Sequence, residues 1–383
     1  MRIIPIASGK GGVGKTILAA NLSIALSQAG KKVVVADLDL GGSDLHLVLG
    51  LVGIRKGIGT FLTNNSLKFE EIIVETEYEN LKFIPGDAEI PGTANLKSSQ
   101  KRMIIRKLHS LEADYLIMDL GAGTNFNVID FFLTSRRGII ITTPTPTARL
   151  NAYLFLKNTV FRIMSSSFKK NSKAREYMGG MLQGGSSPQK IYVPYLLKTI
   201  REKDPDSYSR FREKLGNFSP RIILNLLEDP SEVKRAEKLR RSCREYLDLD
   251  IEHLGIIYRD DLQDIALQSR LPIIRYKPNS VLSQAVYRIT DKLIQEEAET
   301  EEEAPLDFES LDETYQTAEM EAELDFETKM RYMEDLLHCG ALTMGDLVET
   351  IKSQQYEINQ LKKENYFIKA KLVKAIQAGF IDR

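Results

Sequence analysis

Cysteine is scarce in this sequence, and long apolar stretches are absent. The two cysteines, Cys243 and Cys339, lie far apart and show no metal-ligand spacing, which favours free thiols in a reducing compartment. No apolar run reaches the roughly 18–20 residues of a membrane span. The N-terminus passes from Arg2 through an apolar segment into a glycine loop without the cleavage site of a signal peptide. We therefore expect a cytoplasmic protein whose membrane contact, if any, is peripheral at the inner face of the membrane.

The small net charge of −1 hides a strong asymmetry along the chain. Residues 296–327 contain fifteen acidic side chains and no basic one, so the remainder carries about 14 excess positive charges. This basic remainder could meet an acidic partner, an anionic lipid surface, DNA or the chain's own tail.

The first 40 residues predict one βαβ unit. An apolar run over residues 2–7 leads through the glycine loop into an apolar helix at Thr16–Gln28, and a strand follows at residues 33–36. Further strands are predicted at Leu81–Ile84, Tyr115–Met118, Gly138–Thr142, Ile222–Asn225 and Ile251–Ile257, and helices at Ser99–Leu111, Thr147–Ile163, Ser231–Leu247 and Ser280–Gln295. The fold class is therefore α/β, a mostly parallel sheet with helices on both faces.

Two segments interrupt this alternation. Residues 165–218 are far longer than a usual connection, and we interpret them as a helical insertion with a flexible first half and a basic helical part over residues 195–215. Residues 296–328 are predicted to be an acidic linker, disordered or weakly helical. The predicted domains are thus a core over residues 1–295 and a helical C-terminal segment over residues 329–383.

The C-terminal segment shows a heptad pattern, in which residues recur alternately three and four positions apart. Its seam is Met344, Leu347, Ile351, Gln354, Ile358, Leu361, Asn365, Ile368, Leu372 and Ala375. Eight of these ten residues are apolar, and Asn365 falls at an a position, where a buried Asn favours a parallel two-stranded register. The pattern predicts a coiled coil that pairs with a second copy or another protein. A single amphipathic helix docked on the core is the alternative.

The loop Gly9–Thr16 lies between a strand and a helix, where a phosphate-binding loop belongs. Its glycines let successive N–H groups point at phosphate oxygens, and the helix N-terminus adds partial positive charge. Lys15 should bridge the β- and γ-phosphates, and Thr16 should supply a hydroxyl to Mg²⁺. The nucleotide-binding residues expected here are Gly11, Gly12, Val13, Gly14, Lys15, Thr16 and Ile17, and the ligands are ATP and Mg²⁺.

A second lysine, Lys10, is not needed in an ordinary P-loop. The segment Lys10–Thr16 resembles the deviant Walker A loop of the MinD/ParA family of SIMIBI-type P-loop NTPases, in particular the FlhG (FleN)/MinD branch. The resemblance implies that Lys10 reaches the nucleotide of a partner subunit in an ATP sandwich dimer. Ile17 replaces a second threonine of the family, which should weaken nucleotide binding by about 0.5–1.5 kcal/mol. Asp44 and His46 also depart from the residues usual in MinD.

Three further segments carry the resemblance. In Asp37-Leu38-Asp39, the resemblance implies that Asp39 activates the attacking water and that Asp37 helps to organise the metal shell. Asp119 ends the apolar strand of a Walker B element and is expected to hold Mg²⁺ through water. Asn225 ends a later strand, where an Asn of the family reads the adenine edge. The metal-site residues expected here are thus Thr16, Asp37 and Asp119.

The resemblance implies a slowly hydrolysing, partner-stimulated ATPase that dimerises on ATP and acts in spatial positioning or assembly regulation, at the division site or in flagella. An unidentified protein partner is expected and membrane contact should be weak. A ParA-like DNA-partitioning ATPase is an alternative, since basic residues of the insertion and of residues 234–244 could bind phosphates. A coiled-coil scaffold with a structural nucleotide is a third.

Overall fold

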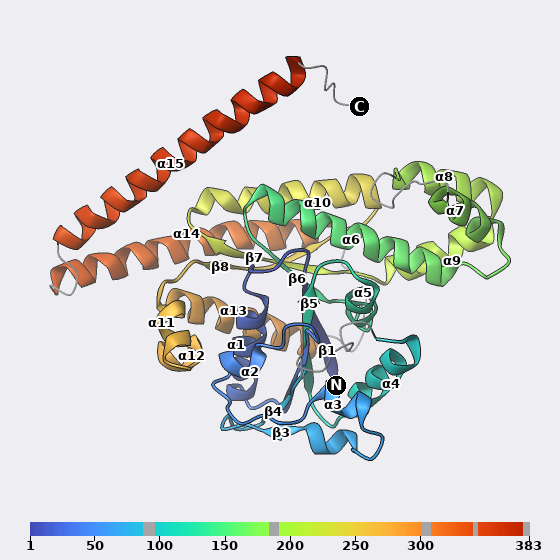
Figure 1. Cartoon of the computed structure of the whole chain (residues 1–383), viewed down its shortest axis with the longest axis horizontal. Helices are drawn as coiled ribbons and strands as arrows, with labels where there is room; N and C mark the ends of the chain where they lie inside the picture. Colours follow the sequence, from blue (N-terminus) through green and yellow to red (C-terminus); the bar gives the residue numbers. More distant parts are fainter. Residues whose placement is uncertain (87–95, 184–190, 300–307, 340–343, 378–383) are drawn as a thin grey trace. The chain divides into compact units, whose positions relative to one another are not determined.

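The computed structural model describes residues 1–383 except 87–95, 184–190, 300–307, 340–343 and 378–383. Its centre is an eight-stranded sheet with the order β3-β4-β2-β5-β1-β6-β7-β8 (Figure 1). The strands are β1 (Arg2–Ser8), β2 (Val33–Leu38), β3 (Val74–Glu75), β4 (Leu81–Ile84), β5 (Tyr115–Ala122), β6 (Ile139–Thr142), β7 (Arg221–Leu227) and β8 (Glu252–Tyr258). Only β3 runs antiparallel to its neighbour, and the other pairs are parallel. The predicted α/β fold is confirmed.

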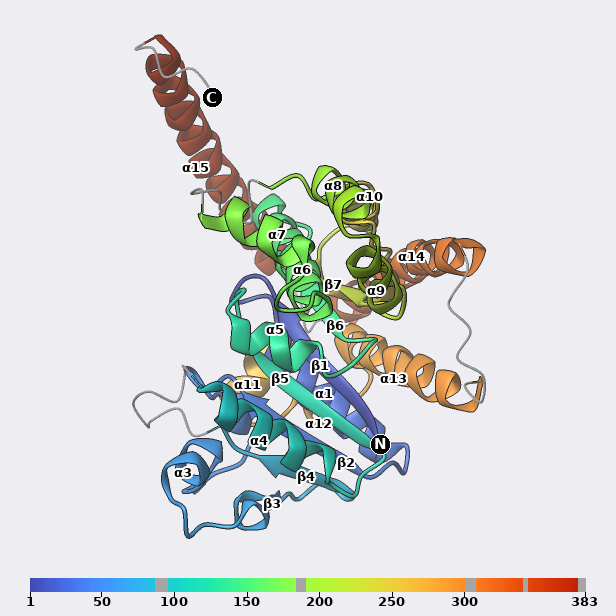
Figure 2. The same cartoon turned by 90° about the vertical axis from the view of Figure 1, so that its right-hand side faces the viewer.

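Helices cover both faces of the sheet (Figure 2). One apolar cluster joins α1 (Lys15–Gln28), α12 (Ile273–Tyr276) and α13 (Val281–Glu299) to the sheet. The other joins α4 (Ser98–His109), α5 (Phe126–Phe132), α6 (Pro146–Ser167) and α10 (Lys234–Leu247). Shorter elements are α2 (Leu45–Val48), α3 (Ile58–Thr63), η1 (Phe69–Ile72), η3 (Pro230–Val233) and α11 (Leu262–Gln268). The nearly all-apolar strands follow from this two-sided cover.

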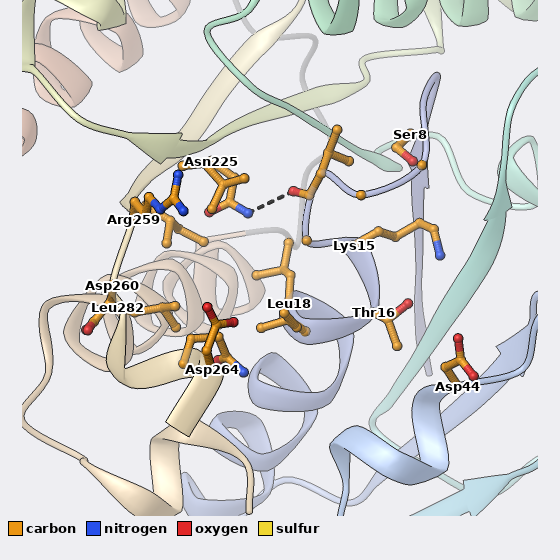
Figure 3. A pocket seen from close by; sticks show the side chains of 18 of the residues that line it. Ser8, Lys15, Thr16, Leu18, Asp44, Asn225, Arg259, Asp260, Asp264 and Leu282 are labelled. Atoms are coloured by element: carbon orange, nitrogen blue, oxygen red, sulfur yellow. Dashed lines mark hydrogen bonds between the residues drawn. The ribbon is translucent and has the colours of Figure 1, made fainter. Parts of the chain in front are cut away.

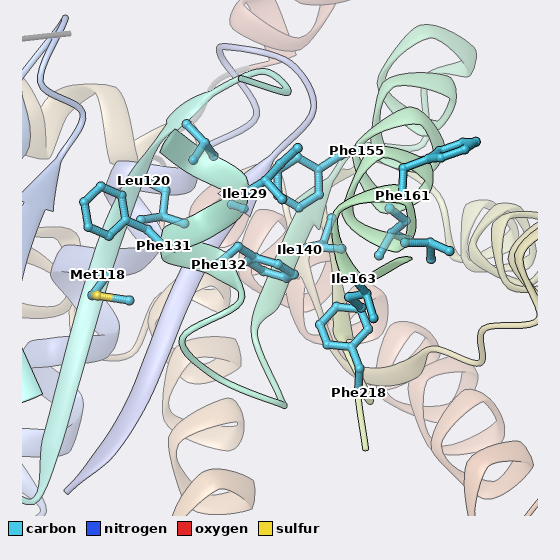
Figure 4. Packing of buried hydrophobic residues seen from close by; sticks show 14 of the residues in the cluster. Met118, Leu120, Ile129, Phe131, Phe132, Ile140, Phe155, Phe161, Ile163 and Phe218 are labelled. Atoms are coloured by element: carbon cyan, nitrogen blue, oxygen red, sulfur yellow. The ribbon is translucent and has the colours of Figure 1, made fainter. Parts of the chain in front are cut away.

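Aromatic side chains fill the cluster between the sheet and α5 and α6. Phe132 of α5 packs edge-on against Phe155 of α6, with ring centroids 5.0 Å apart, and against Phe218, at 6.1 Å (Figure 4). These edge-to-face pairs add to the stabilisation that comes from burying the rings. The helix that follows the Walker B strand is thus held firmly on the sheet.

The insertion is folded along most of its length. It contains α7 (Lys173–Gln183), α8 (Val193–Lys203) and α9 (Pro205–Gly216), and α6 continues to Ser167. Their inward side chains belong to the same buried cluster as α6: Ala174, Met178, Leu196, Ile200, Phe211 and Leu215. The expectation of a flexible first half is therefore wrong for α7, which is helical and buries Ala174 and Met178. Residues 184–190, which also belong to the segment predicted to be flexible, lie outside the residues that the structure describes.

The acidic segment is also folded where the structure describes it. Residues 308–338 form helix α14 (Phe308–His338), and its first half belongs to the compact unit of residues 1–326. Leu311, Tyr315, Ala318 and Ala322 are buried, and the last three pack with side chains of β7 and β8. The linker prediction for residues 296–328 is thus wrong over residues 308–326, while residues 300–307 fall outside the description.

Helix α14 lies along β8, one of the two edge strands of the sheet. The outward-facing N–H of His253 in β8 donates to Thr314 Oγ1 at 3.1 Å, and Tyr315 Oη donates to the carbonyl of Ile251 at 3.1 Å. Ion pairs flank these contacts: Arg240 with Asp312 at 2.6 Å, Lys292 with Glu321 at 2.7 Å, and Arg288 with Asp325. An uncovered edge strand is a liability in a sheet protein, and α14 covers part of the β8 edge here.

Residues 327–383 form a second compact unit. It contains the end of α14 and helix α15 (Met344–Gln377). The helical prediction for the C-terminal segment is confirmed, whereas its pairing stays a prediction. Among the described residues, no helix is long and apolar enough to pass through a bilayer.

Candidate nucleotide site

The predicted site residues gather at the carboxyl ends of the parallel strands, where α/β sheets place their ligands. There a cavity of about 480 Å³ opens between the glycine loop, α1 and the end of β8 (Figure 3). Nine predicted residues line it: Gly11, Gly12, Val13, Gly14, Lys15, Thr16, Ile17, Asp39 and Asn225. Asp37 and Asp119 are not among the described lining residues because they are buried beneath the loop.

The glycines of the loop are required by its close packing. Gly14 caps α1 in the left-handed conformation with φ +88°, and a Cβ there would lie 2.3 Å from Asn225 Nδ2. A Cβ on Gly9 would lie 2.1 Å from the backbone oxygen of Asn151 in α6. Side chains at these positions would therefore push the loop away from β7 and α6.

Asn225 holds the glycine loop from the neighbouring strand. Its buried side-chain Nδ2 donates to the carbonyl of Val13 at 2.8 Å (Figure 3). This hydrogen bond fixes the loop's backbone against β7. The base-reading role expected for Asn225 remains a prediction, and the structure gives its amide a second task that the sequence did not indicate.

Lys15 and Asp119 form a buried pair at the bottom of the site. Lys15 Nζ lies 2.7 Å from Asp119 Oδ1, and the two residues are only 7% and 1% exposed. Burial raises the pKa of Asp119, and the charge of Lys15 and the hydroxyl of Thr16 oppose that rise. The P-loop cation, the Thr16 hydroxyl and the Walker B carboxylate thus meet at one point.

Asp37 organises the loop that follows β2. Its carboxylate accepts hydrogen bonds from the N–H of Asp39 at 3.0 Å, the hydroxyl of Ser43 at 2.7 Å and the N–H of Leu45 at 3.2 Å. Burial, and next the charge of Asp119, raise the pKa of Asp37 to about 7. The sequence did not single out Ser43, although a Ser six residues after a strand-ending Asp is a plausible loop partner.

The Asp39 carboxylate lies against the end of β5. A Cβ on Gly121 would lie 3.1 Å from Asp39 Oδ1, so only glycine leaves this carboxylate its full space. Asp39 is half-buried and lines the cavity. This position suits a carboxylate that holds a water beside the phosphates.

The side chain of Lys10 is exposed, whereas that of Lys15 is buried. The backbone carbonyl of Lys10 accepts a hydrogen bond from Ser8 Oγ at 2.9 Å, while its side chain is not among the described residues lining the cavity. Ile17 is half-buried, lines the cavity and packs on the α1 side of the core. The Lys10 side chain is therefore exposed to solvent, next in sequence to Gly11 of the cavity lining.

The far end of the cavity is formed by residues that the sequence did not indicate. Leu226, which follows Asn225, has a left-handed backbone with φ +59° and is 38% exposed. Such strain in a non-glycine residue costs about 1–3 kcal/mol and is common at functional sites. Arg259, Asp260 and Asp261 follow β8 and line the same end. The rule that ligands bind beyond the carboxyl ends of strands would have suggested them.

The residues present fit a nucleotide with Mg²⁺. The glycine loop provides a cradle that side chains would fill, and the buried Asp119 and Thr16 offer a carboxylate and a hydroxyl to a cation. Among the described residues no cluster of three or more His, Cys, Asp or Glu could hold a metal alone. Mg²⁺ in phosphate sites needs only one or two protein ligands, since waters and phosphates supply the rest.

Sequence comparisons agree with this geometry. Residues 1–156 match a family model described as ParA, an NUBPL iron-transfer P-loop NTPase. The flagellum site-determining protein YlxH of Helicobacter pylori is 36% identical over 158 residues, which cover 41% of this chain and 53% of that protein. The septum site-determining protein MinD of the same organism is 31% identical over 143 residues, covering 37% and 53%. The chain thus spans about half the length of these curated relatives.

Solved structures share the fold over a longer stretch. MinD of Pyrococcus horikoshii, complexed with Mg-ADP, aligns over 79% of this chain and 99% of its own with a TM-score of 0.53 and 21% identity. The MinC:MinD complex of Aquifex aeolicus aligns over 80% and 99% with a TM-score of 0.51 and 21% identity. At this identity the likeness shows the fold. The sequence match to P-loop NTPases of the ParA/MinD family thus covers residues 1–156, the N-terminal part of a larger compact unit that has a MinD-like fold.

Proposed function

We propose that this protein is an ATP-binding, slowly ATP-hydrolysing dimeric switch of the MinD/FlhG type that acts in spatial positioning or assembly regulation. One observation carries the proposal: the two loop lysines point to different places. Lys15 is buried on Asp119 of its own chain, whereas Lys10 is exposed beside the cavity. An exposed cation at the rim suits a phosphate site of a second subunit.

Each side chain has a role in this proposal. Lys15 and the loop N–H groups bind and orient the phosphates, and Thr16 and Asp119 would hold Mg²⁺, which neutralises charge on the phosphates when bound. Asp39 positions a water and accepts its proton. Asp37 keeps the Asp39 backbone in place through the 3.0 Å hydrogen bond from its N–H. Lys10 would stabilise the transferred charge across the dimer.

Three variants test these roles by steady-state hydrolysis and nucleotide binding. We expect Asp39→Ala to lower the hydrolysis rate about 100-fold or more while ATP still binds, because only the water's proton acceptor is lost. Lys10→Ala should also lose hydrolysis and keep binding. Lys32 is an exposed lysine just before β2, at the end of that strand away from Asp39. The matched control Lys32→Ala should therefore behave as wild type. Normal hydrolysis by Lys10→Ala would refute a role for Lys10.

Co-expression distinguishes a contribution across the dimer from one within the chain. A Lys15→Ala chain cannot bind ATP well but still offers its Lys10. Dimers mixed from Lys10→Ala and Lys15→Ala chains should therefore recover part of the wild-type rate, which neither variant shows alone. Mixed dimers that stay inactive would contradict the sandwich arrangement.

The DNA-partitioning alternative finds less support in the charges of α10. Its arginines are paired with carboxylates: Arg235 with Glu232 at 2.8 Å, Arg240 with Asp250 at 2.8 Å, and Arg241 with Glu237 at 2.9 Å. Paired arginines offer little net charge to a phosphate backbone. Strongly salt-dependent DNA binding that appears only with ATP would reverse this preference.

A further inference from the structure

Helix α15 exposes a row of large apolar side chains. Ile351, Ile358, Leu361 and Ile368 are 62%, 43%, 51% and 63% exposed. They lie on one helix of 34 residues, Met344–Gln377. Isolated helices gain most of their stability by packing an apolar face, so this row requires a partner.

The residue types in the row favour a second parallel helix. In the heptad register, Ile351 and Ile358 occupy a positions and Leu347 and Leu361 occupy d positions. β-branched residues at a with Leu at d favour two strands, and an Asn at a, here Asn365, fixes a parallel register at some cost in stability. Two d positions, Gln354 and Ile368, depart from this pattern. The charges beside the seam are therefore needed to decide the partner and the orientation of the pair.

The charges beside the seam distinguish the possible partners. Glu357 and Glu364 occupy g positions, and Lys362 and Lys369, five residues after each, occupy e positions. In a parallel in-register pair of identical helices, each g residue faces the e residue five positions on in the other helix, so four Glu–Lys pairs form. In an antiparallel pair, g faces g and e faces e, which brings like charges together. The pattern is self-complementary in the parallel arrangement alone.

We propose that α15 pairs with α15 of a second copy as a parallel, in-register, two-stranded coiled coil that forms without nucleotide. The partner is another copy because the same helix supplies both signs of charge at matching positions. In this arrangement both P-loop units leave the coil from the same end. The proposal does not depend on the proposed hydrolysis, and it makes the nucleotide act on chains that are already paired.

Light scattering on the full-length, nucleotide-free chain tests the pairing. We expect a mass twice the 43.3 kDa of one chain at micromolar concentration. Ile358→Asp combined with Leu361→Asp should give a monomer, because four charges would enter the seam of the pair. The control Asn359→Asp with Gln360→Asp adds the same charge on the same turn, away from the seam, and should stay dimeric.

Three results would overturn the proposal: a nucleotide-free wild-type monomer, a trimer, or a dimer that survives both seam substitutions. The monomer would point instead to pairing with a different protein. Lys10→Ala should leave the nucleotide-free dimer intact, so a failure of the coil and a failure of the ATP sandwich give different results.

Cross-linking tests orientation and register. In a Cys339→Ser background, Ile351→Cys should form a disulfide between two full-length chains under mild oxidation. In a parallel pair the two positions face each other, whereas in an antiparallel pair they lie about 27 Å apart, at 1.5 Å per residue. Ser353→Cys, at a c position of the heptad outside the seam, is the control. Absence of the Ile351→Cys cross-link in a dimeric sample would exclude the parallel register.

Discussion

At the scale of single residues, Asp37 is a buried carboxyl group, and burial disfavours its charged form. Burial and Asp119 raise its pKa from the ordinary 3.8 to about 7, so the folded protein binds this proton more tightly than the unfolded chain. The stabilising contribution is therefore complete below about pH 4 and is lost as pH rises through about 7. Relative to Asp37→Asn, the wild type should lose about 1–3 kcal/mol of unfolding free energy between pH 5 and 8.

Urea unfolding of the nucleotide-free protein at several pH values measures this difference. A difference between wild type and Asp37→Asn that stays constant over that range would mean that Asp37 is ionised in the folded state throughout. If the wild type instead gained unfolding free energy relative to Asp37→Asn as the pH rises, the pKa of Asp37 would be lowered in the folded state, contrary to the prediction.

Asn225 allows the loop-holding and base-reading roles to be separated. Because its Nδ2 is bonded to Val13 at 2.8 Å, Asn225→Ala leaves a buried carbonyl unsatisfied and should loosen the glycine loop. We expect the affinities for ATP and GTP to fall by a similar factor, about tenfold, as for a lost buried hydrogen bond. Calorimetry with both nucleotides checks this. A selective loss of ATP over GTP would instead establish the base-reading role.

The residues of the site could be found from the sequence because their chemistry needs fixed local spacing. Gly14, Lys15 and Thr16 must be consecutive at the start of a helix, and Asp119 must end an apolar strand. The bond from Asn225 to Val13 joins residues 212 positions apart, and the left-handed Leu226 has no sequence signature. Contacts that depend on how strands bring distant segments together could not be predicted.

At the scale of elements, α14 behaves as part of the core rather than as a linker. Tyr315 is buried, donates to the Ile251 carbonyl, and lies under Arg240, whose guanidinium is 4.7 Å from its ring centre. Tyr315→Ala should therefore destabilise the full chain by about 3 kcal/mol. Gln316→Ala, at the next and exposed position, should change stability by less than about 0.5 kcal/mol. Equal effects in thermal or urea unfolding would restore the linker interpretation.

The sequence misled at α14 for a physical reason. Its buried residues Leu311, Tyr315, Ala318 and Ala322 follow a helical period, but two are alanines set among acidic residues. That composition is typical of disorder. The charges that stabilise the helix, Arg240, Arg288 and Lys292, lie elsewhere in the sequence, so their pairing could not be foreseen. Seven of the eight strands, by contrast, were predictable because burial on both faces makes them continuous apolar runs. The two-residue β3 was missed because it is short and partly exposed.

At the scale of the whole molecule, a paired tail changes how activity depends on concentration. While the coil stays paired, the two P-loop units that it joins meet at an effective concentration that dilution does not lower. Hydrolysis per wild-type chain should therefore be constant over the micromolar concentrations at which light scattering shows a dimer. In the Ile358→Asp, Leu361→Asp variant it should rise with concentration, because the units must find each other by diffusion. A concentration-dependent wild-type rate would show that the tail does not bring the units together.

Helix α14 also determines where this chain can safely be cut. The sheet fold looks complete at Gln295, yet a chain ending there would uncover the outward N–H of His253, the carbonyl of Ile251 and the apolar surface beside them. A bare parallel edge strand next to an apolar patch invites other molecules to add strands. Such a fragment should aggregate. A cut after Phe326 keeps these contacts and should yield a fragment that does not aggregate.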